Sequence, residues 1–382
     1  MRLLFPLAGF LIAGLSILLD WRNARPDSWY CRSGLCRFHQ IFAAPSSAAR
    51  LATDLATLLN EDPADPLVWC TYAELLAARG KIPEANAAFD RAVSLGPGLS
   101  HVLVRAAHYD LGHDREEQGL ALAGQVLRQT ELFDQSLFND LAHGGVPVFE
   151  LLGSAVPATA RAARSWLGFL YAQGSDLDLL QTWAWMGANR LADEKSAVDL
   201  TRTLWQRKSF RAAQDVWADW IGPAHDGYLH PQRLANTRFA EEPNGSPFDW
   251  TLAAGPAVEF SRRDGLDVRF SGKENADFAP VSQFATVSPG RYRFSAEIGA
   301  EGITTDQGPF FRVFDPANPG RLSVQTPPVL GSVARSRVTL DFAVPPGTEA
   351  IAVRIERRPS LRFDNKIAGL LHVYRVSLTP LP

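Results

Sequence analysis

The stretch TRFAEEPNGSPFDWTLAAG, Thr237–Gly255, separates two parts of the sequence that have different hydrophobic periods. Up to about residue 222, apolar residues recur every three or four positions, which is typical of amphipathic helices. Within the stretch that period ends at four turn-forming residues: Pro243, Asn244, Gly245 and Pro247. Proline and glycine favour turns over helix. We therefore predict an interdomain linker and first strand lead-in over residues 223–247.

Downstream of the linker, over residues 248–382, the hydrophobic period changes to two. The alternating segments are GLDVRFSG (265–272), RYRFSAEIGA (291–300), RVTLDFAVP (337–345) and AIAVRIERR (350–358). Such alternation predicts strands with one face in the core and one in water. Turn signals such as SPGR and PPGT separate the segments. About eight strands of this kind predict a two-sheet antiparallel β-sandwich of the jelly-roll type.

Upstream of the linker, residues 65–98 contain two amphipathic helices separated by Gly80. Their sequence, DPLVWCTYAELLAARGKIPEANAAFDRAVSLGPG, resembles the tetratricopeptide repeat (TPR) family at six positions: Trp69, Gly80, Ala85, Phe89, Ala92 and Pro97. Small alanines allow two antiparallel helices to approach, and Phe89 fills the space between them. One repeat cannot bury its own apolar face, so we predict a TPR-like helical solenoid over residues 46–222. The resemblance implies a protein-binding surface, although a purely structural spacer is an open alternative.

The N-terminal segment LLFPLAGFLIAGLSILL, Leu3–Leu19, carries no charge. At about 1.5 Å per residue its length is roughly that of a bilayer hydrocarbon core. Because no small-residue cleavage site follows, we predict an uncleaved signal anchor, a transmembrane helix over residues 1–22, and a linker over 23–45. Arginines after Asp20 favour the opposite orientation, since basic residues tend to stay in the cytoplasm. Cys31 and Cys36 allow either a disulfide in an oxidising compartment or two reduced thiols.

Composition excludes several classes of function. The net charge of −3 over 382 residues provides no basic surface, so we expect no nucleic-acid partner. Three cysteines without zinc-site spacing predict no metal, and no cofactor motif is present. We expect no catalytic residues, because neither a nucleophile elbow nor a Walker loop occurs. A glycosidase would need two carboxylates facing each other across a cleft, and no such pair can be singled out.

The order of the β segments resembles a second family. NTRF…FDW, GLDVRFSG, VSPGRYRFSAEI, FAVPPGTEAIAVRIER and IAGLLHVYRVSL follow one another as in the jelly-roll carbohydrate-binding modules appended to glycoside hydrolases. Many such modules hold a structural calcium ion through an Asp at the start of the last strand. This chain has Tyr374 and Arg375 there, so we expect no calcium at that position.

The whole chain, including TTDQGPFFRVFD (304–315), resembles the TPR proteins that accompany bacterial exopolysaccharide and O-antigen secretion. This resemblance implies a single-pass protein of the cell inner membrane with most of the chain in the periplasm. It also implies membrane-embedded or periplasmic partner proteins of a polysaccharide assembly system. The multidomain α + β architecture would then combine an anchor, a protein-docking solenoid and a β-sandwich that binds a polysaccharide.

A sugar site needs aromatic faces for stacking and planar polar groups that pair with hydroxyls. Residues of these types near expected strand ends are Trp250, Thr305, Asp306, Gln307, Arg312, Arg354 and Asn365. Each has an ordinary alternative: Trp250 suits a sandwich core, and Asp306 with Gln307 suits a turn. The sequence thus favours a non-catalytic scaffold of envelope polysaccharide assembly. The alternative is a pure protein-interaction scaffold whose sandwich binds no sugar.

Overall fold

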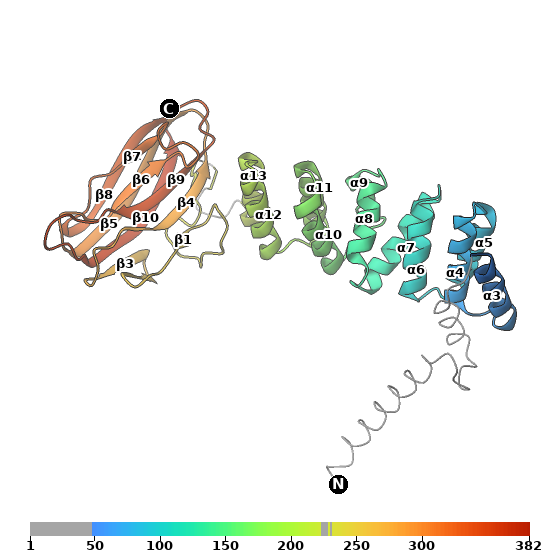
Figure 1. Cartoon of the computed structure of the whole chain (residues 1–382). Coiled ribbons are helices and arrows are strands. Elements are labelled where there is room, and N and C mark those ends of the chain that lie inside the picture. The colour runs from blue at the N-terminus through green and yellow to red at the C-terminus, as the bar shows by residue number, and fades with distance from the viewer. Residues whose placement is uncertain (1–47, 223–227, 230) are drawn as a thin grey trace, which may run out of the picture. The chain divides into compact units, whose positions relative to one another are not determined.

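The computed structural model describes residues 48–222, 228–229 and 231–382 (Figure 1). The predicted anchor Leu3–Leu19 and the Cys31/Cys36 pair lie outside the described residues. Within the described ranges, no helix combines the length and the apolar character needed to span a membrane. The chain divides into two compact units, one ending at Phe169 and the other comprising Leu170–Pro382.

The first unit consists of helices joined by short turns. They are α3 (Ala48–Glu61), α4 (Pro66–Ala78), α5 (Ile82–Leu95), α6 (Ser100–Leu111), α7 (Glu116–Gln129), α8 (Asp134–His143), α9 (Val148–Leu151) and α10 (Ala160–Gln173), whose last turn belongs to the second unit. Pro66, Ser100 and Asp134, which begin α4, α6 and α8, are spaced 34 residues apart. This spacing confirms the predicted helix-pair repeat.

The α4–α5 pair shows why this sequence forms a hairpin of helices. Asp65 caps α4, since its carboxylate accepts hydrogen bonds from the backbone N–H groups of Leu67 and Val68. Gly80 ends the helix with φ 71°, a left-handed conformation that glycine adopts without strain. The predicted interface residues are all buried, at 0–3% exposure: Ala85, Ala88, Phe89 and Ala92. The expected small-and-large packing is therefore confirmed.

The repeat is interrupted between α8 and α10. In place of a full second helix the chain forms α9, which has only four residues. Helix α10 consequently begins 26 residues after α8, rather than 34. An aromatic cluster fills this part of the core: the ring of Phe138 lies 5.1 Å from that of Trp166 and 5.6 Å from that of Phe169.

The second unit contains three further helices and ten strands within its described residues. The helices are α11 (Asp176–Ala188), α12 (Glu194–Gln206) and α13 (Phe210–Ile221). The strands are β1 (Thr251–Leu252), β2 (Val258–Arg262), β3 (Leu266–Ser271), β4 (Phe278–Thr286), β5 (Gly290–Ile303), β6 (Phe310–Phe314), β7 (Ser323–Gln325), β8 (Gly331–Val344), β9 (Ala350–Arg357) and β10 (Ala368–Pro380).

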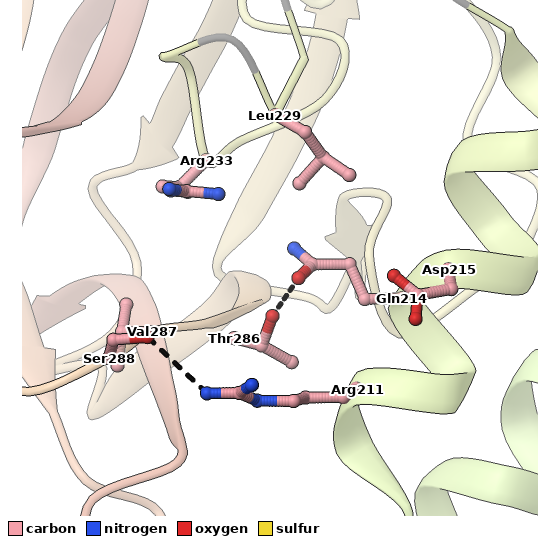
Figure 2. A pocket seen from close by; sticks show the side chains of 8 residues that line it. All are labelled: Arg211, Gln214, Asp215, Leu229, Arg233, Thr286, Val287 and Ser288. Carbon is pink, nitrogen blue, oxygen red and sulfur yellow. Dashed lines mark hydrogen bonds between the residues drawn. The ribbon is translucent and has the colours of Figure 1, made fainter.

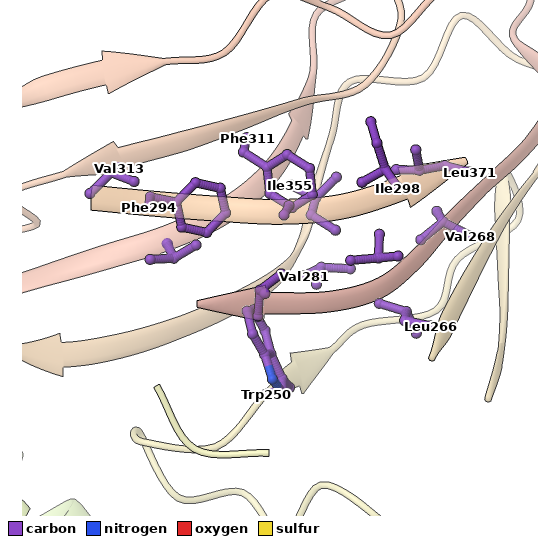
Figure 3. Packing of buried hydrophobic residues seen from close by; sticks show 14 of the residues in the cluster. Trp250, Leu266, Val268, Val281, Phe294, Ile298, Phe311, Val313, Ile355 and Leu371 are labelled. Carbon is purple, nitrogen blue, oxygen red and sulfur yellow. The ribbon is translucent and has the colours of Figure 1, made fainter. Parts of the chain in front are cut away.

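The strands form two five-stranded antiparallel sheets, in the orders β1-β4-β9-β6-β7 and β2-β3-β10-β5-β8. Side chains from both sheets meet in one core, where the ring of Phe294 on β5 lies 5.2 Å from that of Phe311 on β6 (Figure 3). The alternation predicted for β5 is confirmed, because its apolar residues are all at most 4% exposed: Tyr292, Phe294, Ala296 and Ile298. The predicted β-sandwich is therefore present.

Helices α12 and α13 pack directly on the sandwich. The ring of Trp205 on α12 lies 4.7 Å from that of Phe284 on β4 and 5.4 Å from that of Phe248. Leu234 and Phe239, within the predicted linker, belong to the sandwich core. The division into compact units therefore falls in α10 and does not coincide with the predicted linker at 223–247.

Asp110 on α6 is a buried carboxyl, only 1% exposed, whose Oδ1 lies 3.3 Å from Nε of Arg115. Burial raises its pKa from the usual value to about 6, and Arg115 partly counteracts this effect. Between about pH 4 and pH 6 the folded chain therefore binds more protons than the unfolded chain. The free energy of unfolding should fall as the pH rises through this window.

We expect Asp110→Asn to raise the free energy of unfolding above pH 6 by on the order of 1–3 kcal/mol, because asparagine has no charge to bury. Urea denaturation followed by circular dichroism at pH 4.5 and pH 7.5 would measure this. The same change at an exposed carboxyl, Glu131→Gln, should have little effect. A variant less stable than wild type at pH 7.5 would show instead that the ion pair with Arg115 outweighs the cost of burial.

Candidate functional site

The second unit contains a cavity of about 450 Å³ where α13 meets the sandwich (Figure 2). Three segments line it. Helix α13 contributes Arg211, Gln214 and Asp215, the end of β4 and the residues after it contribute Thr286, Val287 and Ser288, and the segment before the sandwich contributes Leu229 and Arg233. The three α13 residues share one face because they are three and four positions apart.

Buried hydrogen bonds hold the walls of this cavity in place. Gln214 is 6% exposed, and its Oε1 accepts a hydrogen bond from the hydroxyl of Thr286. Its Nε2 lies 3.5 Å from the hydroxyl of Tyr228, whose pKa is raised by burial. The backbone N–H of Arg233 donates to the carbonyl of Leu378 on β10, at 2.8 Å. The cavity is thus anchored to both sheets of the sandwich.

Two arginines give the cavity its charge. Figure 2 shows Arg211 and Arg233 on two sides of the Gln214–Thr286 pair. Arg211 reaches the Ser288 hydroxyl at 3.4 Å, whereas Nε of Arg233 is buried and has no hydrogen-bond partner among the described residues. Asp215 is the one carboxylate in the lining, so the lining carries a net positive charge. Guanidinium groups bind carboxylates and phosphates through paired hydrogen bonds, so this site suits an anionic ligand that carries hydroxyls.

None of the seven sugar-site residues predicted from the sequence lines this cavity. Four of them, Thr305, Asp306, Gln307 and Asn365, lie in loops that converge on Arg357. This arginine is 1% exposed and donates to the carbonyls of Gln307 (2.9 Å) and Asn365 (3.1 Å) and to Oδ1 of Asn275 (3.0 Å). The structure therefore brings the four residues together around a buried cation.

Asp306 is engaged by the protein itself. Its carboxylate accepts a hydrogen bond from the Ser360 hydroxyl at 2.5 Å and lies 3.2 Å from Nε of Arg362. The hydrogen bond from Ser360 lowers the pKa of Asp306 below its usual value. Asp306 thus joins the loop after β5 to the loop after β9.

Arg312 and Arg354 form a separate pair on the outer face of the β4-containing sheet. They are direct neighbours in the β6–β9 register. Their guanidinium groups lie 4.5 and 4.9 Å from the ring centre of Phe314, and both approach Glu356, at 3.5 and 3.9 Å. The two arginines cover the aromatic ring, so this surface offers planar polar groups instead of an open aromatic platform.

Trp250 requires a correction. Its side chain is 1% exposed, its ring packs 4.7 Å from that of Phe239, and its Nε1 donates to the carbonyl of Asn236 at 3.0 Å. A ring buried in this way has no free face to stack against a sugar. The structure therefore places Trp250 in the sandwich core, which was its alternative interpretation.

Comparisons with solved structures find TPR proteins and carbohydrate-binding modules. The TPR protein YrrB, described as having an unusual peptide-binding site, is 19% identical with a TM-score of 0.26, over 47% of this chain and 97% of YrrB. Pseudomonas aeruginosa PilF is 13% identical with a TM-score of 0.26, over 48% of this chain and 88% of PilF. TmCBM61, solved in complex with β-1,4-galactotriose, is 15% identical with a TM-score of 0.27, over 39% of this chain and 99% of that module.

No protein-family model matches the sequence, and a search of curated proteins finds no significant match. Because the TM-scores are below 0.5, the description of this chain as a TPR-like helical-repeat protein with a β-sandwich rests on its own helix spacing and sheet topology.

We expect Arg357→Ala to lower the free energy of unfolding by about 3 kcal/mol or more, because several buried acceptors would lose their donor at once. Urea denaturation of the full chain, followed by tryptophan fluorescence, would measure the loss. The neighbouring Arg358→Ala, at an exposed position, should change stability by less than about 1 kcal/mol. Equal stability of the two variants would show that Arg357 does not organise these loops.

Proposed function

We propose that this chain is a non-catalytic, membrane-anchored accessory protein of envelope polysaccharide assembly or export, in an exopolysaccharide or O-antigen system. In this proposal the Leu3–Leu19 segment anchors the chain in the inner membrane, and the bulk of the protein lies in the periplasm. The helical repeats dock membrane-embedded or periplasmic proteins of the system. The second unit binds the polysaccharide.

The observation that carries the polysaccharide proposal is the basic cavity beside α13. It combines two guanidinium groups, an amide and two hydroxyls in about 450 Å³. Carboxylate-bearing sugars present the complementary groups, since a carboxylate pairs with a guanidinium and ring hydroxyls pair with an amide or hydroxyl. An acidic polysaccharide, rich in uronic acid, is therefore the ligand class that this cavity fits best.

A second candidate function, a pure protein-interaction scaffold, is favoured by one loop of the sandwich. Between β9 and β10, Leu361 and Phe363 are fully exposed, at 101% and 105% of their reference areas. Apolar side chains held in water are typical of surfaces that contact another protein. In this alternative the sandwich would dock a protein through the loop and bind no sugar.

Substitution of both cavity arginines tests the first candidate. We expect Arg211→Gln combined with Arg233→Gln to weaken binding of the full chain to immobilised polyuronic acid at least tenfold, about 1.4 kcal/mol, because the carboxylates lose their charged donors. Glycan-array titration would measure the affinity. The exposed Arg263→Gln serves as the control and should bind as wild type does.

Equal retention of polyuronic acid by the double variant would contradict the assignment of this cavity. Absence of any acidic polymer binding by the wild-type chain, together with loss of a partner protein in a Leu361→Ser, Phe363→Ser variant, would favour the pure scaffold.

The membrane proposal is tested separately. Alkaline phosphatase fused after Pro382 should be active, because it folds only after export, and the fusion should sediment with membranes. Deletion of residues 1–22 should remove both properties. An inactive phosphatase fusion paired with an active cytoplasmic reporter would place the bulk of the chain in the cytoplasm, as the arginines after Asp20 suggest.

A further inference from the structure

A second cavity of the same unit lies beside the C-terminal end of α13 and has the opposite chemical character. Its volume is about 310 Å³, and the lining includes Trp217, Trp220, Asn236, Asn244, Glu194 and Glu241. No Arg, Lys or His lines it, whereas two arginines line the first cavity. The second cavity therefore disfavours an anionic ligand.

Trp217 provides a hydrogen-bond donor without an acceptor. Its side chain is 2% exposed, and its Nε1 is buried without a hydrogen-bond partner among the described residues. Other indoles of this unit are satisfied: Nε1 of Trp183 donates to Asp219 at 3.1 Å, and that of Trp250 to the carbonyl of Asn236. A buried N–H group without an acceptor is costly, so an acceptor oxygen supplied by a ligand in this cavity would be stabilising.

Trp220 provides an apolar face. It is partly exposed, and its ring packs edge-on against Trp183, with 6.4 Å between ring centres. Ile221 adds a further apolar side chain to the lining. A sugar ring has apolar C–H faces and polar edges, so a fixed indole with polar groups around it is suited to bind one.

The polar groups around Trp220 are held in defined positions. Nδ2 of Asn244 donates to Oε1 of Glu194 at 3.0 Å, and Nδ2 of Asn236 donates to Oδ1 of Asp249 at 3.3 Å. Asp249 is buried, and the backbone N–H of Trp250 donates to it at 2.7 Å. Amide and carboxylate oxygens positioned in this way accept hydrogen bonds from hydroxyl groups.

We infer that this cavity binds one neutral, hydroxyl-rich sugar unit, which stacks on Trp220 and accepts a hydrogen bond from Nε1 of Trp217. The inference rests on the proposed function in one respect, namely that the second unit binds glycan. It adds a site of different specificity: the first cavity takes acidic sugars and the second takes neutral ones. Both sites are lined by α13, so a heteropolymer with both kinds of sugar would have contacts available in each.

Titration of the full chain with neutral oligosaccharides tests this inference. The probes are β-1,4-linked glucose and galactose tetrasaccharides, and the detergent must have no sugar headgroup. We expect saturable binding of at least one probe by calorimetry, together with a change in tryptophan fluorescence. Trp220→Ala should weaken the affinity at least tenfold. Trp185→Ala, a partly exposed tryptophan of α11 outside the cavity, is the matched control and should leave the affinity unchanged.

Trp217→Phe separates binding from folding, because it keeps an aromatic ring and removes only the N–H donor and the second ring. If Nε1 serves the ligand, affinity should fall several-fold while the thermal transition stays near that of wild type. Saturation by neither tetrasaccharide, or unchanged affinity in both Trp217→Phe and Trp220→Ala, would overturn the inference. Normal polyuronic acid binding in the same preparation would then show that the proposed function survives, whereas loss of both kinds of binding would count against it as well.

Discussion

The second unit depends on the attachment of α13 to β4. The buried hydrogen bond between Gln214 and the Thr286 hydroxyl joins residues 72 positions apart, and the contact of Trp205 with Phe284 places α12 on the same sheet. A buried amide requires its partners, so this bond fixes both the position and the rotation of α13. The two cavities follow from that placement, since each takes part of its lining from α13 and the rest from the chain around the sandwich.

Local sequence patterns predicted the elements of this fold because the forces that form them are local. The alanines and Phe89 of the first helix pair, and the alternation from Tyr292 to Ile298, were predicted to be buried and are buried. The cavities could not be predicted in the same way. Arg211 and Arg233 meet only because α13 packs on the sandwich, and no spacing in a single sequence records that contact.

Arg357 is a residue that the sequence pattern could have indicated. In AIAVRIERR the inward positions are Ile351, Val353 and Ile355, and the same period of two places Arg357 inward as well. An arginine at an inward position must find acceptors, and here it finds carbonyls and an amide in three loops. The polar residues predicted as the rim of a sugar site are therefore explained in part as the surroundings of this buried guanidinium.

The short helix α9 has a consequence for how the repeat array can change in length. Helix starts at Pro66, Ser100 and Asp134 share one phase of a 34-residue period, and those at Ala160 and Glu194 share another. A whole repeat inserted or lost within either set would present the same interfaces to its neighbours, because each helix pair contacts chiefly the next. At α9 the phase changes, so a duplicated segment that includes it would place unlike surfaces together. Growth of the array by duplication is thus permitted within each set of helices and blocked at the junction between them.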